Sequence, residues 1–179
     1  MMGRSRAWLW TVPALLVSFA LTAQEPTRNR STNPSIDPNR NPSIDPGRNP
    51  SIDPARNPTI DPQRNPTIDP QRNPSIDPQR NPSLNPTINR SLDPQISRIL
   101  RGLYLWNRYG ERIGILVFAS PSYIVQFGAG EWTGYAVSNG AGGFSIFSVA
   151  GVWVGYMVTN SVAGYNLFDP SGGWIAFTT

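Results

Sequence analysis

The side chains that could carry acid–base or metal chemistry in this sequence are carboxylates. Glu111 and Glu131 take matching positions, each directly after a glycine that ends a turn-like segment. A glycosidase needs two carboxylates at a set separation, but solvated residues beside turns are the simpler interpretation. Further aspartates recur once per NPSIDPxR repeat, each close to an arginine. They do not bring several oxygens together as a calcium loop does.

Other catalytic groups are missing from the sequence. The chain contains no histidine and no cysteine, which removes the imidazole base, the thiolate nucleophile and the usual transition-metal ligands. No glycine-rich phosphate loop leads from a strand into a helix. We therefore expect a protein that is not an enzyme, with no catalytic residues, no metal site and no cofactor.

Charge points away from nucleic acid as a partner. The formal net charge is +4, but two arginines leave with a predicted signal peptide and most others stand near an aspartate. From Gly102 onward the chain has two basic residues, Arg108 and Arg112, and three carboxylates. A basic surface that could bind a phosphate backbone is therefore not expected there.

Aromatic residues recur in the last part of the chain, in units of about 21 residues. The units are anchored on Gly110, Gly130, Gly151 and Gly172. Two residues after the anchors stand Arg112, Trp132, Trp153 and Trp174. If exposed, these four residues would stack on a ligand, and they are our candidate ligand-binding set. In the alternative, each indole lies over the backbone of the glycine or alanine two residues on and packs between hairpins.

Each unit is predicted to form a β-hairpin. Its turn ends in glycine (107–110, 127–130, 148–151 and 169–172), which is typical of a type I turn closed by a left-handed residue. Alternation along the outgoing strand then assigns one face to the core. That face is expected to hold Ile113, Ile115, Val117, Tyr135, Val137, Val154, Tyr156, Val158, Ile175 and Phe177.

The hairpins need one another. A lone hairpin is not stable in water, and four in an open row would leave two unpaired edges. Without cysteine, no disulfide can hold so small a fold. We therefore predict an all-β domain over residues 102–179, in which four antiparallel β-hairpins close into a pseudo-fourfold ring.

A low-complexity segment, residues 24–101, precedes these hairpins. Its octads (NPSIDPNR, NPTIDPQR and similar) split into Asx-Pro tetrads, each a candidate turn. Proline every four residues excludes helix and regular central strand. One isoleucine per octad buries too little surface to offset ordering, so we expect a disordered repeat spacer. The second possibility is a stacked spiral of turns, with isoleucine on one side and arginine on another.

Residues 1–23 have the features of a secretory signal peptide. Arg4 and Arg6 precede an apolar stretch over 7–21, and cleavage after Ala23 is favoured. A membrane anchor would need about 20 apolar residues, whereas this stretch is shorter and interrupted by Pro13. We expect an exported protein, periplasmic or extracellular, with no stable membrane anchor after cleavage.

Three runs resemble one another: GYNLFDPSGGWIAF (164–177), LYLWNRYGERIGIL and GFSIFSVAGVWVGYM. Together with the NPSIDP octads, they resemble the four-fold β-flower family of exported bacterial proteins. The resemblance implies a closed ring and a bacterial source, but it supplies no activity. Arg112 and Gln126 depart from the usual aromatics of the repeat, which would break a fourfold-equivalent site in the first two units.

These observations favour a non-catalytic binding module on a flexible stalk, with a cell-envelope glycan, other envelope polymer or protein as its partner. The alternative is a purely structural or self-associating envelope protein with no small ligand. Exposure of Trp132, Trp153 and Trp174 discriminates between them, because a ligand platform requires exposed indoles. The oligomeric state stays open.

Overall fold

A computed structural model describes residues 33–97, 102–160 and 162–179. The predicted signal peptide, residues 1–23, lies outside the described residues. Within the described ranges the chain forms a series of short turns followed by eight β-strands. No helix in these ranges has the length and apolar character needed to cross a membrane.

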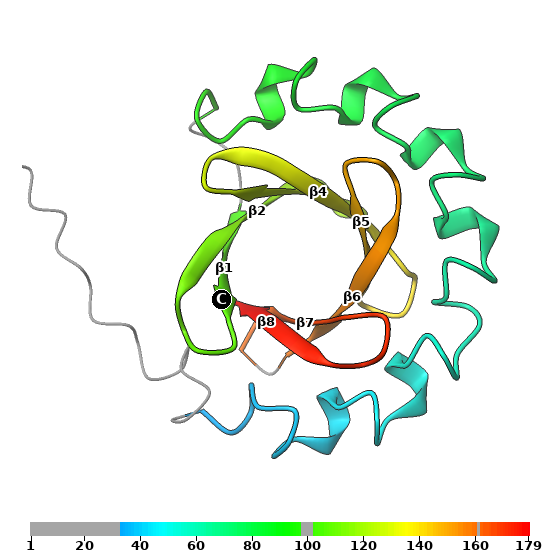
Figure 1. Ribbon diagram of the computed structural model, residues 1–179, viewed down its shortest axis with the longest axis vertical. Helices are drawn as coiled ribbons and strands as arrows, with labels where there is room; N and C mark the ends of the chain where they lie inside the picture. Colours follow the sequence, from blue (N-terminus) through cyan, green and yellow to red (C-terminus); the bar gives the residue numbers. More distant parts are fainter. Residues whose placement is uncertain (1–32, 98–101, 161) are drawn as a thin grey trace, which may run out of the picture.

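The strands pair in chain order into one closed antiparallel barrel (Figure 1). They are β1 (Gly102–Asn107), β2 (Arg112–Ser120), β3 (Tyr123–Gly128), β4 (Glu131–Ser138), β5 (Phe144–Ser148), β6 (Trp153–Thr159), β7 (Tyr165–Phe168) and β8 (Trp174–Thr178). The barrel closes between β1 and β8, where Leu105 pairs with Thr178. The predicted all-β fold is confirmed, and closure removes the unpaired edges of an open sheet.

The same irregularity recurs in the pairs β1–β2, β3–β4, β5–β6 and β7–β8. In β1–β2, Leu105 pairs with Gly114 and Trp106 pairs with Arg112, so Ile113 is an extra residue. Equivalent β-bulges follow Gln126, Ile146 and Leu167. The extra residues are Ile113, Thr133, Val154 and Ile175.

Because of the bulges, the prediction of the core face is wrong for some of its residues. Ile113, Val154 and Ile175 are 44–46% exposed, because the extra residue breaks the alternation from which their burial was inferred. Other predicted core residues, such as Tyr135 and Tyr156, are buried but on the outer face of the barrel. The interior instead holds Leu105, Leu116, Ile124, Ala136, Phe144, Ile146, Met157, Leu167 and Ala176.

The turn of the second hairpin also differs from its prediction. Gly128 pairs with Glu131, which leaves a two-residue turn. Its residues Ala129 and Gly130 have φ of 51° and 87°, the pattern of a type I′ turn. This unit is one residue shorter than the others, so Phe127, and not Gln126, takes the recurring aromatic position.

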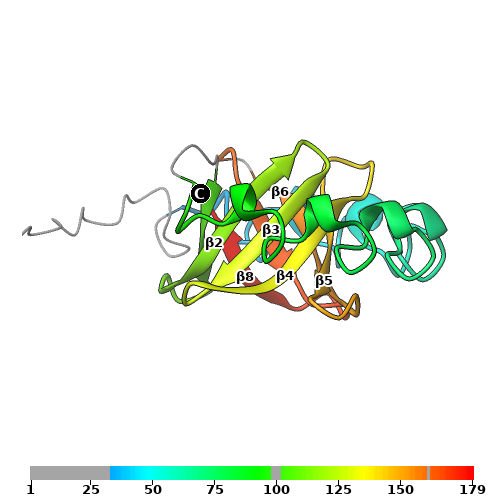
Figure 2. The same ribbon diagram turned by 90° about the horizontal axis from the view of Figure 1, so that it is seen from above.

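Residues 33–97 form a belt of turns around the barrel (Figures 1 and 2). In a typical octad, Asp61 accepts a hydrogen bond from the amide of Gln63 (2.9 Å) and Asn65 accepts one from the amide of Thr67 (3.1 Å). The predicted Asx-Pro turns are therefore present. Several are 3-10 turns: η2 (Pro42–Ile44), η3 (Pro50–Ile52), η4 (Pro66–Ile68), η5 (Pro74–Ile76), η6 (Pro82–Leu84) and η7 (Arg90–Leu92).

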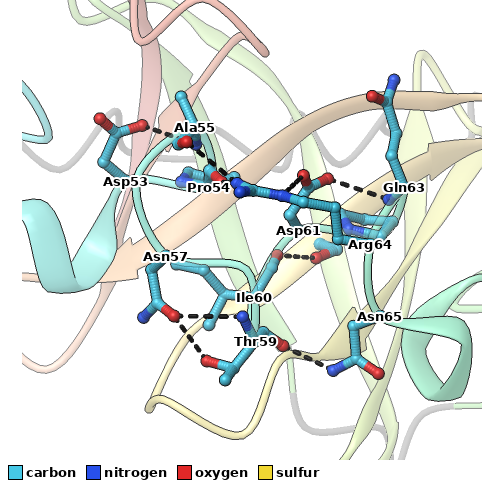
Figure 3. Close-up of polar contacts among 12 residues, drawn as sticks. Asp53, Pro54, Ala55, Asn57, Thr59, Ile60, Asp61, Gln63, Arg64 and Asn65 are labelled. Atoms are coloured by element: carbon cyan, nitrogen blue, oxygen red, sulfur yellow. Dashed lines mark hydrogen bonds and ion pairs between the residues drawn. The ribbon is translucent and has the colours of Figure 1, made fainter.

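Each octad is fastened to the one before it. The Arg64 side chain donates to the carboxylate of Asp61 at 2.5 Å and also to the carbonyl of Pro54 (Figure 3). The Asn65 side chain donates to the carbonyl of Thr59 at 2.6 Å. The arginine bridge to the preceding octad recurs at Arg48, Arg56, Arg72 and Arg80.

The expectation of a disordered spacer is therefore wrong for residues 33–97, which follow the second possibility, turns with isoleucine on one side. Ile36, Ile44 and Ile60 are at most 5% exposed, because they face the barrel. The expectation failed because it counted only the apolar surface within the octads. The outer face of the barrel supplies the other half of a shared core.

Aromatic pairs on the outer face form that half. Tyr135 stacks on Phe147 with ring centroids 5.6 Å apart, and Tyr156 stacks on Phe168 at 5.5 Å. Each pair joins one hairpin to the next, since Tyr135 pairs with Phe147 across β4–β5. Ile44 packs in the cluster of Tyr156 and Phe168. Belt and barrel thus bury each other's apolar residues.

Candidate functional site

The described belt, residues 33–97, covers only part of the circumference of the barrel. Asn166 on β7 donates to the carbonyl of Ile36 (2.6 Å), and Ser145, at the matching position of β5, donates to that of Ile60 (3.5 Å). These isoleucines are three octads apart, so four hairpins would need about twelve octads, and the belt has about two thirds of that length. The sector without described belt residues lies at β1 (Figure 1).

We call the outer surface of the β1–β2 hairpin in this sector the belt-gap face. It consists of Tyr104, Trp106, Arg112, Ile113 and Ile115. Tyr104 and Ile113 are each 46% exposed. A groove of about 460 Å³ opens between this face and the turn of the second hairpin. It is lined by Tyr104, Arg112, Ile113, Gly114, Ile115, Phe127, Ala129 and Gly130.

The belt-gap face combines a cation with aromatic rings. The Arg112 guanidinium lies 5.4 Å from the centroid of the Tyr104 ring, within the range of a cation–π contact. The Trp106 ring meets Tyr104 edge-on, with centroids 6.3 Å apart. Such a surface can bind a group that is apolar or flat on one side and negatively charged on another.

The four predicted ligand-binding residues do not form one site. Arg112 lines the groove, whereas Trp132, Trp153 and Trp174 lie half-buried on β4, β6 and β8. The indoles of Trp132 and Trp153 donate to the carbonyls of Gly134 (2.8 Å) and Gly155 (2.7 Å). This geometry fits the packing interpretation better than a ligand platform.

The glycines beside these tryptophans lie against the backbone of the next hairpin. A Cβ at Gly134 would overlap the carbonyl oxygen of Phe147, and one at Gly155 would overlap that of Phe168. Gly114 meets the carbonyl of Phe127 in the same way. The missing side chain thus permits close approach of two strands from successive hairpins.

Sequence reasoning missed Tyr104 and Trp106 as candidate site residues. A signal was present for Tyr104, which stands where the other hairpins have Val125, Ser145 and Asn166. Arg112 breaks the tryptophan column in the same hairpin. Two departures in one unit distinguish the first hairpin from the other three. The departure at Arg112 is visible in the sequence, and the strand register identifies the equivalents of Tyr104.

The carboxylates of Glu111 and Asp169 accept hydrogen bonds within hairpin turns. Glu111 accepts a hydrogen bond from the Asn107 side chain at 2.7 Å. Hydrogen bonds from the Ser171 side chain and from the amides of Gly173, Ser171 and Gly172 lower the pKa of Asp169 below its usual range. In the part of the chain that the structure describes, no group of three His, Cys, Asp or Glu residues could hold a metal ion.

Comparison of the chain with protein-family models, with curated proteins and with solved structures found no match to any of them.

Proposed function

We propose that this protein is an exported, non-catalytic binding module that recognises a cell-envelope polymer, a glycan or a protein, through the belt-gap face. The observation that carries the proposal is the uneven cover of the barrel. The described belt packs on the outer face of the β3–β4, β5–β6 and β7–β8 hairpins and leaves a groove, with Arg112 beside Tyr104, at the β1–β2 hairpin. Because residues 33–97 lie on the barrel, the proposal no longer includes a flexible stalk formed by them.

The test compares equivalent residues of different hairpins. The full chain is sedimented with purified peptidoglycan and with extracted envelope proteins, and the bound fraction is measured. Arg112→Ala and Ile113→Ala should weaken binding about tenfold, which corresponds to ~1.4 kcal/mol. Ile175→Ala, at the bulge position of the fourth hairpin, should bind like the parent. Absence of binding, or equal loss in all three variants, would refute the proposal.

A second candidate function, self-association, is favoured by apolar residues at the turn end of the barrel. Ile113, Val152, Val154 and Ile175 are 44–54% exposed, and all four hairpin turns lie at this end (Figure 2). Exposed apolar clusters mark interaction surfaces. Sedimentation velocity over a concentration series should then show association that Val154→Asp abolishes. A monomer at all concentrations would exclude it.

We further propose export and membership of the four-fold β-flower family. The apolar stretch after Arg4 and Arg6 supports export, and mass spectrometry of the mature protein should give a chain that begins at Gln24. Recurrence of the bulge in each hairpin supports a pseudo-fourfold ring. A mature chain that retains residues 1–23 would contradict export.

A further inference from the structure

The belt-gap face repeats the pattern of the surface that the belt covers elsewhere. At each junction of two hairpins, one residue of an outgoing strand pairs with an aromatic residue of the next strand. The pairs are Ile115–Phe127, Tyr135–Phe147, Tyr156–Phe168 and Phe177–Trp106. Ile44 and Ile52 of the belt pack in the cluster of the third pair, and Leu92 of the belt lies in the cluster of Phe127, against which Ile115 packs. The groove beside Ile115 and Phe127 therefore has the chemistry of a surface that accepts an octad isoleucine.

The groove also continues the path of the belt. The Gln95 side chain in the last octad donates to the carbonyl of Gly130 at 2.8 Å, and Gly130 lines the groove. Gln79, two octads earlier, makes the corresponding contact with the carbonyl of Val149 at 3.0 Å. The last described turn of the belt thus stops at the edge of the groove, where a further octad would lie.

We propose that the belt-gap face binds an Asx-Pro-x-Ile segment of another polypeptide, placed as the next octad of the belt. This inference rests on the proposed binding function and narrows the polymer to a protein. In the chain's own octads, Ile36, Ile44, Ile60 and Ile68 are buried against its own barrel. Ile88 and Ile96 are 62% and 55% exposed, but they end turns that already have their own places in the belt. Residues 24–32 (QEPTRNRST) contain no aliphatic residue to supply the anchor.

Arg112 selects for an acidic segment. In the belt, each octad aspartate from Asp45 to Asp77 pairs with the arginine three residues later at 2.5–2.6 Å. The belt-gap face carries an arginine where the other hairpins have tryptophan. A partner whose aspartate has no arginine of its own can pair with Arg112, because charge-assisted hydrogen bonds to a free carboxylate are the stronger ones. The preferred segment therefore has the form Asn-Pro-x-Ile-Asp-Pro without a following arginine.

The experiment titrates the full chain against a fluorescent peptide, NPTIDPQSNPTIDPQS, and follows fluorescence anisotropy. We expect saturable binding. Arg112→Ala and Tyr104→Ala should each weaken it about tenfold, whereas Ile175→Ala should leave the dissociation constant unchanged. A peptide with serine in place of both isoleucines should not bind. A peptide with arginine in place of the serine three residues after each aspartate, NPTIDPQRNPTIDPQR, should bind more weakly. Near-UV circular dichroism verifies that each variant is folded. Because Arg112→Ala and Tyr104→Ala change different residues of the same face, a folding defect in one of them leaves the other as a test.

The outcomes separate this inference from the proposed function. If peptidoglycan binds at the belt-gap face and the octad peptide does not, the inference is overturned and the binding function stands. If peptidoglycan, the extracted envelope proteins and the octad peptide all fail to bind, both are overturned. Peptide binding that Arg112→Ala and Tyr104→Ala leave intact would refute the site. Self-association that blocks the groove, with no peptide binding, would make a second copy the occupant and overturn the assignment to another polypeptide.

Discussion

At the scale of single residues, the close approach of successive hairpins depends on glycines that follow each bulge. Gly155 faces the carbonyl of Phe168 with no room for a methyl group. We expect Gly155→Ala to destabilise the protein by about 1–3 kcal/mol, because neither strand can move without breaking the barrel ladder. Urea unfolding measures the change.

Gly47→Ala is the matched control for this substitution. The next octad already has Ala55 at the equivalent position, so the change in unfolding free energy should stay within about 0.5 kcal/mol. Equal effects of the two substitutions would show that the hairpins do not meet at Gly155 as described.

Buried tyrosines on the outer face make stability sensitive to alkali. Burial is the main cause that raises the pKa of Tyr123, Tyr135 and Tyr156 well above the ordinary value of 10.0. The unfolded chain releases these protons at lower pH than the folded one, so stability is intact below pH ~10 and falls as pH rises further.

Tyr135→Phe tests this at one position. Its hydroxyl is buried without a hydrogen-bond partner among the described residues, and the fourth unit already has Phe177 in this column. We expect the free energy of unfolding at pH 7 to stay unchanged or to rise by up to about 1 kcal/mol. Above pH 10, the melting temperature of the variant should fall less steeply than that of the parent. A loss above about 1.5 kcal/mol would mean that the hydroxyl has a partner.

What the sequence predicted at this scale was limited by the bulges. The Asx-Pro turns, the hairpin glycines and the place of Trp132 beside Gly134 follow from residue type and spacing. The exposure of Ile113, Val154 and Ile175 does not, because a bulge changes which face a residue takes and leaves little mark on composition. Tyr104 became a candidate only when register identified its equivalents.

At the scale of elements, the arginines hold the octads in series. Arg64→Lys removes the planar fork that reaches both Asp61 and the carbonyl of Pro54. Since these side chains are partly exposed, we expect a local loss of about 0.5–1 kcal/mol. Amide hydrogen exchange of residues 57–65 should speed up accordingly.

Arg40→Lys serves as its control. The Arg40 Nε lies 3.8 Å from the Asp37 carboxylate, a looser pair than the 2.5 Å contact at Arg64. Exchange near Asp37 should therefore change little. A similar acceleration at both sites would indicate that the charge alone holds the octads, without the bridge to the preceding one.

Element types were predictable from sequence, and their relation to one another was not. Proline spacing correctly excluded α-helix and regular strand from residues 33–97, but the exclusion of all helix was wrong, because short 3-10 turns form there. The repeat near Gly110 and Gly151 correctly gave hairpins. Order in the belt depends on a surface more than sixty residues away, as the contact from Gln79 to Val149 shows. Local composition carries no information on such a surface.

At the scale of the whole molecule, the protein has two apolar layers. One fills the barrel interior around Leu116 and Met157. The other lies between barrel and belt, around Tyr135 and Leu92 on one side and Tyr156 and Ile44 on the other. Loss of the belt would expose the stacked aromatic rings to water, so the two parts are expected to form one cooperative unit.

The most direct test of this shared core is urea unfolding of the full chain followed by two probes. Near-UV circular dichroism reports the barrel aromatics, and hydrogen exchange of the belt amides reports the octads. We expect the two transitions to coincide and Ile60→Asn, in the belt, to lower both midpoints together. Unfolding of the belt at low urea, with the barrel signal unchanged, would contradict the account.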